Sequence, residues 1–269
     1  MPVIFPQFEE DSHHRADVIK MIPLPTDRLL CGPFAIIYNV KRYLIGIDEA
    51  GRGPLAGPVA VGAVIVPSDF DWSLVIGAKD SKQMTPKARE EIYAKLCDLR
   101  RDGKLDFTVT FSSASMIDMR GIVLSIQSAL DAALSKITEV GPLQKRWITT
   151  DVRPLYGDIR VVLDGGLRAP MRFTDQETII RGDQSEPVIS LASIAAKVLR
   201  DRHMTRLARK HPAYGFEAHK GYGTLAHRRA IKQAGLCSLH RATFCTRIIY
   251  SGFSRSKRVA EARPLRVAT

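Results

Sequence analysis

Apolar residues recur along this chain with two different periods, and the alternation between them predicts a mixture of strands and helices. Residues 44–47 form a short apolar run, as in a buried strand, and residues 59–66 form a second run that is rich in β-branched side chains. Residues 106–111 alternate between apolar and polar positions, which predicts a third strand. Two further runs, residues 160–163 and 177–182, each lead to an aspartate and complete the predicted set of strands.

Helices are predicted where apolar residues recur every three or four positions. Thr85 followed by Pro86 is typical of an N-cap and a first helical residue, and Thr224 is a similar N-cap. Residues 115–118 resemble a capping box that opens a long helix, although Gly121 weakens the start of that helix. The predicted helices span residues 85–99, 115–137, 188–210 and 224–235.

Two adjacent carboxylates, Asp48 and Glu49, follow the first apolar run, and a glycine-rich turn at residues 51–54 follows them. Hard cations such as Mg²⁺ and Mn²⁺ take oxygen ligands, so this pair is a candidate metal site. Neighbouring residues of a strand point to opposite faces, so both carboxylates serve one site only if the backbone turns there. The alternative interpretation is an exposed acidic corner between two strands, because most carboxylates are solvated surface groups.

Composition adds a strongly basic balance. The 269 residues include 40 Lys and Arg against 28 Asp and Glu, a net charge of +12. This charge favours a polyanionic partner, although a membrane surface or a ribosome would attract it equally. With 45% hydrophobic residues, the chain is able to bury the core of one large domain or two small ones.

The chain lacks the patterns of membrane and secreted proteins. No apolar run reaches the length of about 18 residues that a membrane span requires, and the N-terminus has no continuous apolar stretch typical of a signal peptide. The four cysteines show no CxxC spacing, so free thiols in a reducing cytoplasm are expected rather than disulfides or a zinc site.

Several motifs, in a fixed order, resemble those of the ribonuclease HII family. The first motif, DEAGRGPLAGPV at residues 48–59, matches that family almost letter for letter. Arg52 stands where the related type III enzymes carry lysine. The other matching motifs are KDSKQM (79–84), LDGG (163–166), GDQ (182–184), ISLASIAAKVLRDR (189–202), HKGYGT (219–224) and LHRATF (239–244).

The resemblance implies an α/β protein with an RNase H-like fold. A five-stranded mixed sheet would be flanked by helices on both faces and followed by a helical C-terminal extension. Residues 41–245 would form the catalytic domain. Residues 1–40 would be an N-terminal arm of unknown role, and residues 246–269 a basic, disordered tail.

The resemblance also implies a site of four acidic residues that are both catalytic and metal-binding and that hold two divalent ions, Mn²⁺ or Mg²⁺: Asp48, Glu49, Asp164 and Asp183. Taken alone, an aspartate before glycine is more often a turn residue, and only the order of the motifs assigns this role to Asp164. Asp201 competes with Asp183 for the fourth position. Because Asp201 follows Lys197 by four residues in a predicted helix, an ion pair is the simpler interpretation of Asp201.

Five further residues are implied to contact the substrate: Gly51, Arg52, Gly53, Lys82 and Tyr222. Glycine allows close approach of the main chain to a ligand. Lys82 is a candidate phosphate contact, with a solvated lysine as the alternative. Tyr222 corresponds to the tyrosine that stacks at the junction of ribonucleotide and deoxyribonucleotide, with a half-buried loop aromatic as the alternative.

The implied function is an endoribonuclease that cuts the RNA strand of RNA–DNA hybrids and cuts at single ribonucleotides in duplex DNA. Hydrolysis with two metal ions would leave 3′-hydroxyl and 5′-phosphate ends. A monomer without membrane association is expected. Two other classes stay open: an RNase H-like nuclease that acts on DNA, such as a resolvase, and a nucleic-acid-binding module without catalysis.

Overall fold

The computed structural model describes residues 43–77, 84–139 and 156–250 of the chain. The predicted N-terminal arm at residues 1–40, the candidate phosphate contact Lys82 and the part of the predicted tail beyond residue 250 lie outside the described residues. The division into arm, catalytic domain and tail therefore stays a prediction.

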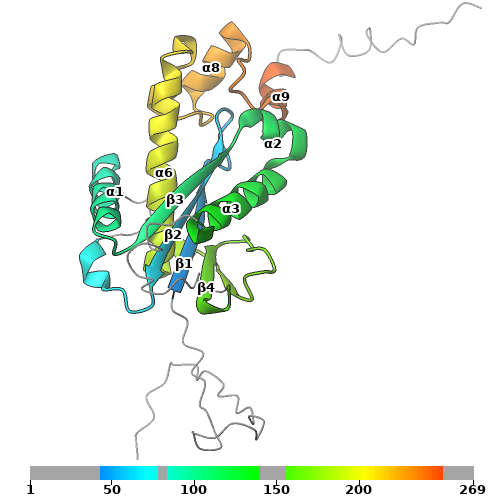
Figure 1. Ribbon diagram of the computed structural model, residues 1–269. Coiled ribbons are helices and arrows are strands. Elements are labelled where there is room, and N and C mark those ends of the chain that lie inside the picture. The colour runs from blue at the N-terminus through cyan, green and yellow to red at the C-terminus, as the bar shows by residue number, and fades with distance from the viewer. Residues whose placement is uncertain (1–42, 78–83, 140–155, 251–269) are drawn as a thin grey trace, which may run out of the picture. The chain divides into compact units, whose positions relative to one another are not determined.

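A five-stranded mixed sheet forms the centre of the described chain, which confirms the predicted fold class (Figure 1). The strand order is β3-β2-β1-β4-β5. Strands β3, β2 and β1 pair antiparallel, whereas β1, β4 and β5 pair parallel. The strands are β1 (Tyr43–Ala50), β2 (Val59–Pro67), β3 (Asp106–Ser112), β4 (Ile159–Asp164) and β5 (Asp175–Ile179). Because β1 and β4 are neighbours and parallel, their carboxyl ends meet at one edge of the sheet.

Helices cover both faces of the sheet and continue into a helical C-terminal part (Figure 1). The helices are α1 (Pro86–Arg101), α2 (Ala114–Arg120), α3 (Ile122–Glu139), α5 (Gly182–Ser185), α6 (Pro187–Ala208), α7 (Phe216–His219), α8 (Leu225–Ala234) and α9 (Ala242–Tyr250), with 3-10 turns η1 (Trp72–Val75), η2 (Tyr156–Asp158) and η3 (Pro212–Tyr214). The predicted N-caps are confirmed, because the Thr85 hydroxyl accepts the Ala88 N–H and the Thr224 hydroxyl accepts the His227 N–H. Within the described ranges, no helix is both long and apolar enough to cross a membrane.

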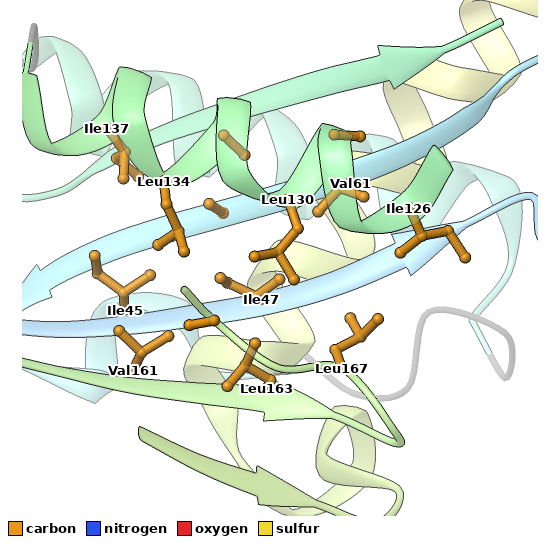
Figure 2. Close-up of a cluster of buried hydrophobic side chains, with 14 of the residues drawn as sticks. Ile45, Ile47, Val61, Ile126, Leu130, Leu134, Ile137, Val161, Leu163 and Leu167 are labelled. Atoms are coloured by element: carbon orange, nitrogen blue, oxygen red, sulfur yellow. The ribbon is translucent and has the colours of Figure 1, made fainter. Parts of the chain in front are cut away.

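Two hydrophobic cores form because successive strand residues point to opposite faces. Ile45 and Ile47 of β1 pack under α3, together with the inward residues of β2 and β4, as Figure 2 shows. Val64 and Val66 of β2 point the other way and pack against α1 and α6. Each fully buried side chain of this size contributes about 1.5–3 kcal/mol relative to an exposed one.

Glycines in the two central strands allow α6 to lie directly on the sheet. A Cβ atom on Gly46 would lie 2.4 Å from the backbone carbonyl of Val188, and a Cβ atom on Gly62 would lie 2.3 Å from the carbonyl oxygen of Ala192. Side chains at these positions would push the helix outward. This close contact sets the height of α6 above the strands that carry the candidate acidic residues.

The helix predicted over residues 115–137 is wrong in its first part. The residues expected to form a single helix from 115 to 137 form two, because Gly121 adopts a φ of +81° and separates α2 from α3. The N-cap is Ser113, whose side chain accepts the Met116 N–H, rather than the predicted Ser115. A left-handed glycine ends a helix at low steric cost, so Gly121 terminates α2 instead of merely weakening a longer helix.

Two predicted strand ends are also wrong. Strand β1 does not stop before Asp48, because residues 48–50 continue to pair with β2. Conversely, β5 ends at Ile179, where its pairing with β4 also ends, so Asp183 lies in the short helix α5 rather than at the end of a strand. Helix α9 runs to Tyr250, so the first five residues of the predicted tail, 246–250, are helical.

Replacing Gly46 by Ala is expected to destabilise the fold by about 1–3 kcal/mol, because the new methyl group would overlap the α6 backbone. Gly166→Ala is the matched control, since a Cβ atom there meets nothing within 4 Å and the backbone is not left-handed. Chemical denaturation of both variants measures the difference. Equal stability of the two variants would mean that α6 moves away without cost.

Candidate active site

Three aspartates from different elements lie together at one edge of the sheet. Ile47 of β1 pairs with Leu163 of β4, so the next residues, Asp48 and Asp164, become neighbours across the parallel pair. Helix α5 adds Asp183. One carboxylate oxygen of each aspartate lies within 4.8 Å of the other two.

The turn between β5 and α5 brings Asp183 into this group. Arg181 adopts a left-handed conformation with φ of 56°, which turns the chain back toward the sheet. A Cβ atom on the next residue, Gly182, would lie 2.6 Å from the Ile189 side chain, so the turn packs tightly against α6. Asp183 is therefore buried, although it lies outside any strand.

Burial makes Asp48 a weak acid. Burial is the largest of the effects that raise the pKa of the Asp48 carboxyl to about 8. The negative charges of Glu49 and Asp164 also raise this pKa, whereas a hydrogen bond with Ser193 lowers it. Below that pH, the carboxyl keeps its proton in the absence of a neighbouring cation. A cation bound beside Asp48 would instead favour the ionised carboxylate.

Two carboxylate oxygens of the site have no hydrogen-bond partner among the described residues. They are Asp48 Oδ2 and Asp164 Oδ1, and both are buried. Unpaired buried oxygens cost free energy unless a ligand satisfies them. Clustered carboxylate oxygens are the donors that Mg²⁺ and Mn²⁺ prefer, so the residues present fit a divalent cation.

Glu49, the fourth predicted carboxylate, lies outside this close group. It follows Asp48 within the continuous strand β1, where successive side chains point to opposite faces. Its carboxylate accepts a hydrogen bond from Arg52 at 3.1 Å, and the Arg52 side chain is 53% exposed. An exposed pair of this kind contributes little to stability, so a substrate or a cation competes with it at small cost.

Asp201 does not join the three clustered aspartates. Its carboxylate accepts a hydrogen bond from Lys197 at 2.9 Å, one turn earlier in α6, which is the expected helical ion pair. It lies instead in the wall of a neighbouring groove.

Two fully buried arginines fix the loop at residues 51–58, and sequence reasoning missed both. Arg241 donates to the carbonyl oxygens of Gly51 at 2.7 Å and of Arg52 at 2.9 Å. Arg200 donates to the carbonyl of Pro58 at 2.8 Å. The available signal was their position inside otherwise matching motifs, in an apolar helix and in LHRATF.

The predicted glycine turn contains two glycines, and the fold requires glycine at only one of the two positions. Gly51 has a φ of +89°, and a Cβ atom there would lie 2.0 Å from Arg200 Nε, so the fold itself requires glycine. Gly53 is exposed, and a Cβ atom there meets nothing within 4 Å. The protein's own packing does not explain Gly53.

Tyr222 lies on the surface beside cationic groups. Its residue is 38% exposed, and its ring centroid lies 5.3 Å from Lys197 Nζ and 5.7 Å from Arg200 Cζ. The ring borders a groove of about 700 Å³ between α1 and α6. The charged residues that line this groove are Arg89, Glu90, Lys197, Asp201, Arg202, Arg206, Arg209 and Lys220.

Comparison with known proteins agrees with these features. The family model described as Ribonuclease HII matches residues 45–250. The chain is 37% identical over 203 residues to a ribonuclease HII of Syntrophotalea carbinolica, covering 76% of this chain and 85% of the relative. It is 37% identical over 208 residues to a ribonuclease HII of Endomicrobium trichonymphae, covering 77% and 88% respectively. Among solved structures, ribonuclease H2 from Pyrococcus horikoshii aligns with a TM-score of 0.56 at 26% identity, over 78% of this chain and 98% of that one.

Replacing Asp48 by Asn is expected to raise the melting temperature of the cation-free protein near pH 7.5, and to raise it less near pH 4.5. The unfolded carboxyl ionises near its ordinary pKa of 3.8, whereas the folded carboxyl keeps its proton up to about pH 8. The native state is therefore progressively disfavoured as the pH rises between these values, and the amide removes this loss.

Thermal unfolding in a chelator at the two pH values measures the effect, since each kcal/mol corresponds to about 2–4 °C for a domain of this size. Asp201→Asn is the control, because its carboxylate is ion-paired and partly exposed. A melting temperature of Asp48→Asn at or below that of the parent near pH 7.5 would contradict the raised pKa.

Proposed function

The chain belongs to the ribonuclease HII family and is a type II ribonuclease H, and from this premise we propose that it cuts RNA–DNA hybrids and single ribonucleotides in duplex DNA. The proposed reaction is phosphodiester hydrolysis that leaves 3′-hydroxyl and 5′-phosphate ends. The observation that carries the proposal is the cluster of Asp48, Asp164 and Asp183, in which Asp48 Oδ2 and Asp164 Oδ1 are buried without a hydrogen-bond partner.

We propose that Asp48, Glu49, Asp164 and Asp183 hold two divalent ions, Mg²⁺ or Mn²⁺. Such ions polarise the phosphate and supply a nucleophilic water at neutral pH. The buried Asp48 gives up its proton when a cation binds, because the cation replaces the proton as the compensating charge. The charge of Glu49 already acts on Asp48 although Glu49 follows it in the same strand, and we propose that Glu49 joins the site by exchanging its partner Arg52, whose side chain is exposed.

Selection of the ribonucleotide requires groups that contact the sugar, because hydrolysis of a phosphodiester does not distinguish RNA from DNA. The carbonyls of Gly51 and Arg52 are occupied by Arg241. Among the described contacts, none uses the N–H groups of Arg52 and Gly53, so these are the main-chain groups that we assign to the substrate. The 2′-hydroxyl both donates and accepts hydrogen bonds, and it is the group that marks a single ribonucleotide.

Tyr222 completes the proposed recognition of the sugar. Its exposed ring offers a flat surface for stacking, and its phenolic hydroxyl can both donate and accept a hydrogen bond. A site that is built to hydrogen-bond a hydroxyl leaves polar groups unpaired when that hydroxyl is absent. All-DNA duplex is therefore expected to bind without being cut.

The basic groove beside Tyr222 supports a nucleic-acid partner. Of its charged residues, Arg202 pairs with Glu90 and Lys197 pairs with Asp201. The lining cations Arg206, Arg209 and Lys220 have no acidic partner among the described ion pairs. Contacts to the backbone phosphates supply most of the affinity for a duplex and fix its register. We assign these phosphate contacts to the groove, together with Lys82. We propose that a monomer binds in this way.

The function is tested by incubating the protein with a duplex that holds one ribonucleotide, an RNA–DNA hybrid and an all-DNA duplex, each with Mg²⁺ or Mn²⁺. We expect cleavage of the first two only. Asp183→Asn is expected to lower cleavage at least about a hundredfold while duplex binding survives. Asp201→Asn is the matched control and should keep most of the activity.

The outcomes separate the candidate functions. Cutting of all-DNA duplex would indicate a resolvase-like nuclease, and binding without cutting of any substrate would indicate a module without catalysis. If Asp201→Asn loses more activity than Asp183→Asn, the fourth carboxylate is Asp201.

Tyr222→Ala and Gly53→Val are each expected to lower cleavage at an embedded ribonucleotide about tenfold or more, with a smaller loss of binding. Alanine removes the stacking surface, and valine pushes the sugar away from the main chain. The melting temperature of Gly53→Val should match that of the parent, because nothing in the protein lies near the new side chain. Parent-like cleavage by Tyr222→Ala would remove this residue from substrate selection.

A further inference from the structure

Several histidines gather in the helical C-terminal part, behind Tyr222. His227 is 0% exposed and His240 is 4% exposed, and both rings contact the ring of Phe216. His219 stacks on His227 with ring centroids 4.3 Å apart. Buried polar rings require partners for their nitrogens, so the hydrogen bonds of the two buried histidines carry information about their role.

The two buried imidazoles form a continuous chain of hydrogen bonds that ends at Tyr222. The N–H of Cys237 donates to His240 Nδ1 at 2.9 Å. The two Nε2 atoms of His240 and His227 lie 3.1 Å apart. At the other end, His227 Nδ1 lies 2.9 Å from the carbonyl oxygen of Tyr222.

The backbone groups at the two ends determine where the protons lie. The Cys237 N–H only donates, so His240 Nδ1 accepts and the His240 proton lies on Nε2. The Cys237 carbonyl lies farther from the same Nδ1, at 3.3 Å, and it accepts the backbone N–H of His240. The Tyr222 carbonyl only accepts, so His227 carries its proton on Nδ1, and its Nε2 accepts from His240.

This arrangement holds only while both imidazoles are neutral, because an extra proton would place two N–H groups against each other. Burial, together with the neighbouring His227, lowers the pKa of His240 to about 4. Burial also lowers the pKa of His227, while its hydrogen bond to Tyr222 opposes the change. Both rings are therefore neutral near pH 7, as the hydrogen-bond chain requires.

This chain of hydrogen bonds connects the two segments that we propose contact the sugar, namely Tyr222 and the loop at residues 51–58. The Tyr222 carbonyl accepts both the His227 ring N–H and the Thr224 N–H. The backbone of His240 forms a bridge with Ala56 in the loop that Arg200 and Arg241 fix. The neighbouring Gly221 carbonyl accepts the N–H groups of Leu55 and Ala56.

We propose that His227 and His240 are positioning residues that hold the Tyr222 backbone, and with it the exposed ring, in register with the glycine turn at residues 51–53. This proposal rests on the proposed role of Tyr222 in substrate selection. Neither histidine contacts substrate. They act through Tyr222, because a misplacement of about 1 Å far from the chemistry can cost about a hundredfold in rate.

The proposal differs from a simple packing role in its dependence on the ring N–H. His227→Phe keeps an aromatic ring but removes the donor to Tyr222 and leaves His240 Nε2–H without an acceptor. His227→Asn is smaller, yet its amide N–H takes the place of the Nδ1–H. Packing alone predicts that Phe is the better substitute, whereas positioning predicts that Asn is.

A double-mutant cycle tests this on the full chain with a duplex that holds one ribonucleotide. We expect His227→Phe to lower kcat about tenfold, with KM little changed, and His227→Asn to lose less. Adding His227→Phe to Tyr222→Ala should cause no further loss, because the histidine acts through the side chain already removed. Equal losses in both backgrounds, or a smaller loss for Phe than for Asn, would overturn the proposal.

Nitrogen-15 NMR of the unmodified chain provides a test that needs no variant and no activity. We expect the proton of His227 on Nδ1, that of His240 on Nε2, and a scalar coupling across the N–H···N bond between the two rings near pH 7. Opposite tautomers, or a charged ring at that pH, would overturn the proposal. If the parent cuts none of the substrates, the proposed function fails, and the NMR result still decides whether the hydrogen-bond chain exists.

Discussion

The hydrogen bonds that two buried guanidinium groups donate to backbone carbonyls hold the candidate active site together. Burial lowers the pKa of Arg241 to about 10 and also lowers the pKa of Arg200. A guanidinium group nevertheless keeps its charge at neutral pH. Their desolvation costs free energy, which the forked donor groups offset by bonding several carbonyls at once. Arg200 comes from α6 and Arg241 directly precedes α9, so the loop at residues 51–58 is fixed by parts of the chain that are far away in sequence. The acceptors of these hydrogen bonds are neutral backbone carbonyls, so the bonds leave Asp48 Oδ2 and Asp164 Oδ1 available to a cation.

The acidic cluster is the opposite case, in which the fold accumulates charge that the chain does not neutralise. Strand pairing forces Asp48 and Asp164 side by side, and the α5 turn adds Asp183. Buried carboxylates with unpaired oxygens are destabilising, and proteins keep such features where function requires them. The close packing of α6 through Gly46 holds the strands and the α5 turn at a fixed distance, so the site cannot relieve its repulsion by expanding.

Much of the candidate site could be predicted because it lies in contiguous motifs. Each of the apolar runs before Asp48 and Asp164 indicated a strand, and both became neighbouring strands of the sheet. Asp201 was assigned an ion pair from its spacing to Lys197 alone, and the structure contains that pair. The errors fell where local signals compete: Gly121 splits a helix whose apolar periodicity continues across it, and Asp183 follows a left-handed turn that no periodic pattern indicates.

The sequence by itself determined the strands, most helices, the fold class and the family, because periodicity, caps and ordered motifs are local properties of a chain. Only the tertiary structure decided which groups meet. It separated Gly51, which the fold requires, from Gly53, which the fold leaves free, and it joined His227 and His240 to the Tyr222 carbonyl. Such contacts depend on distances between segments that lie up to 190 residues apart, as for Arg241 and Gly51. No local pattern encodes these distances, since they arise from the packing of the whole core.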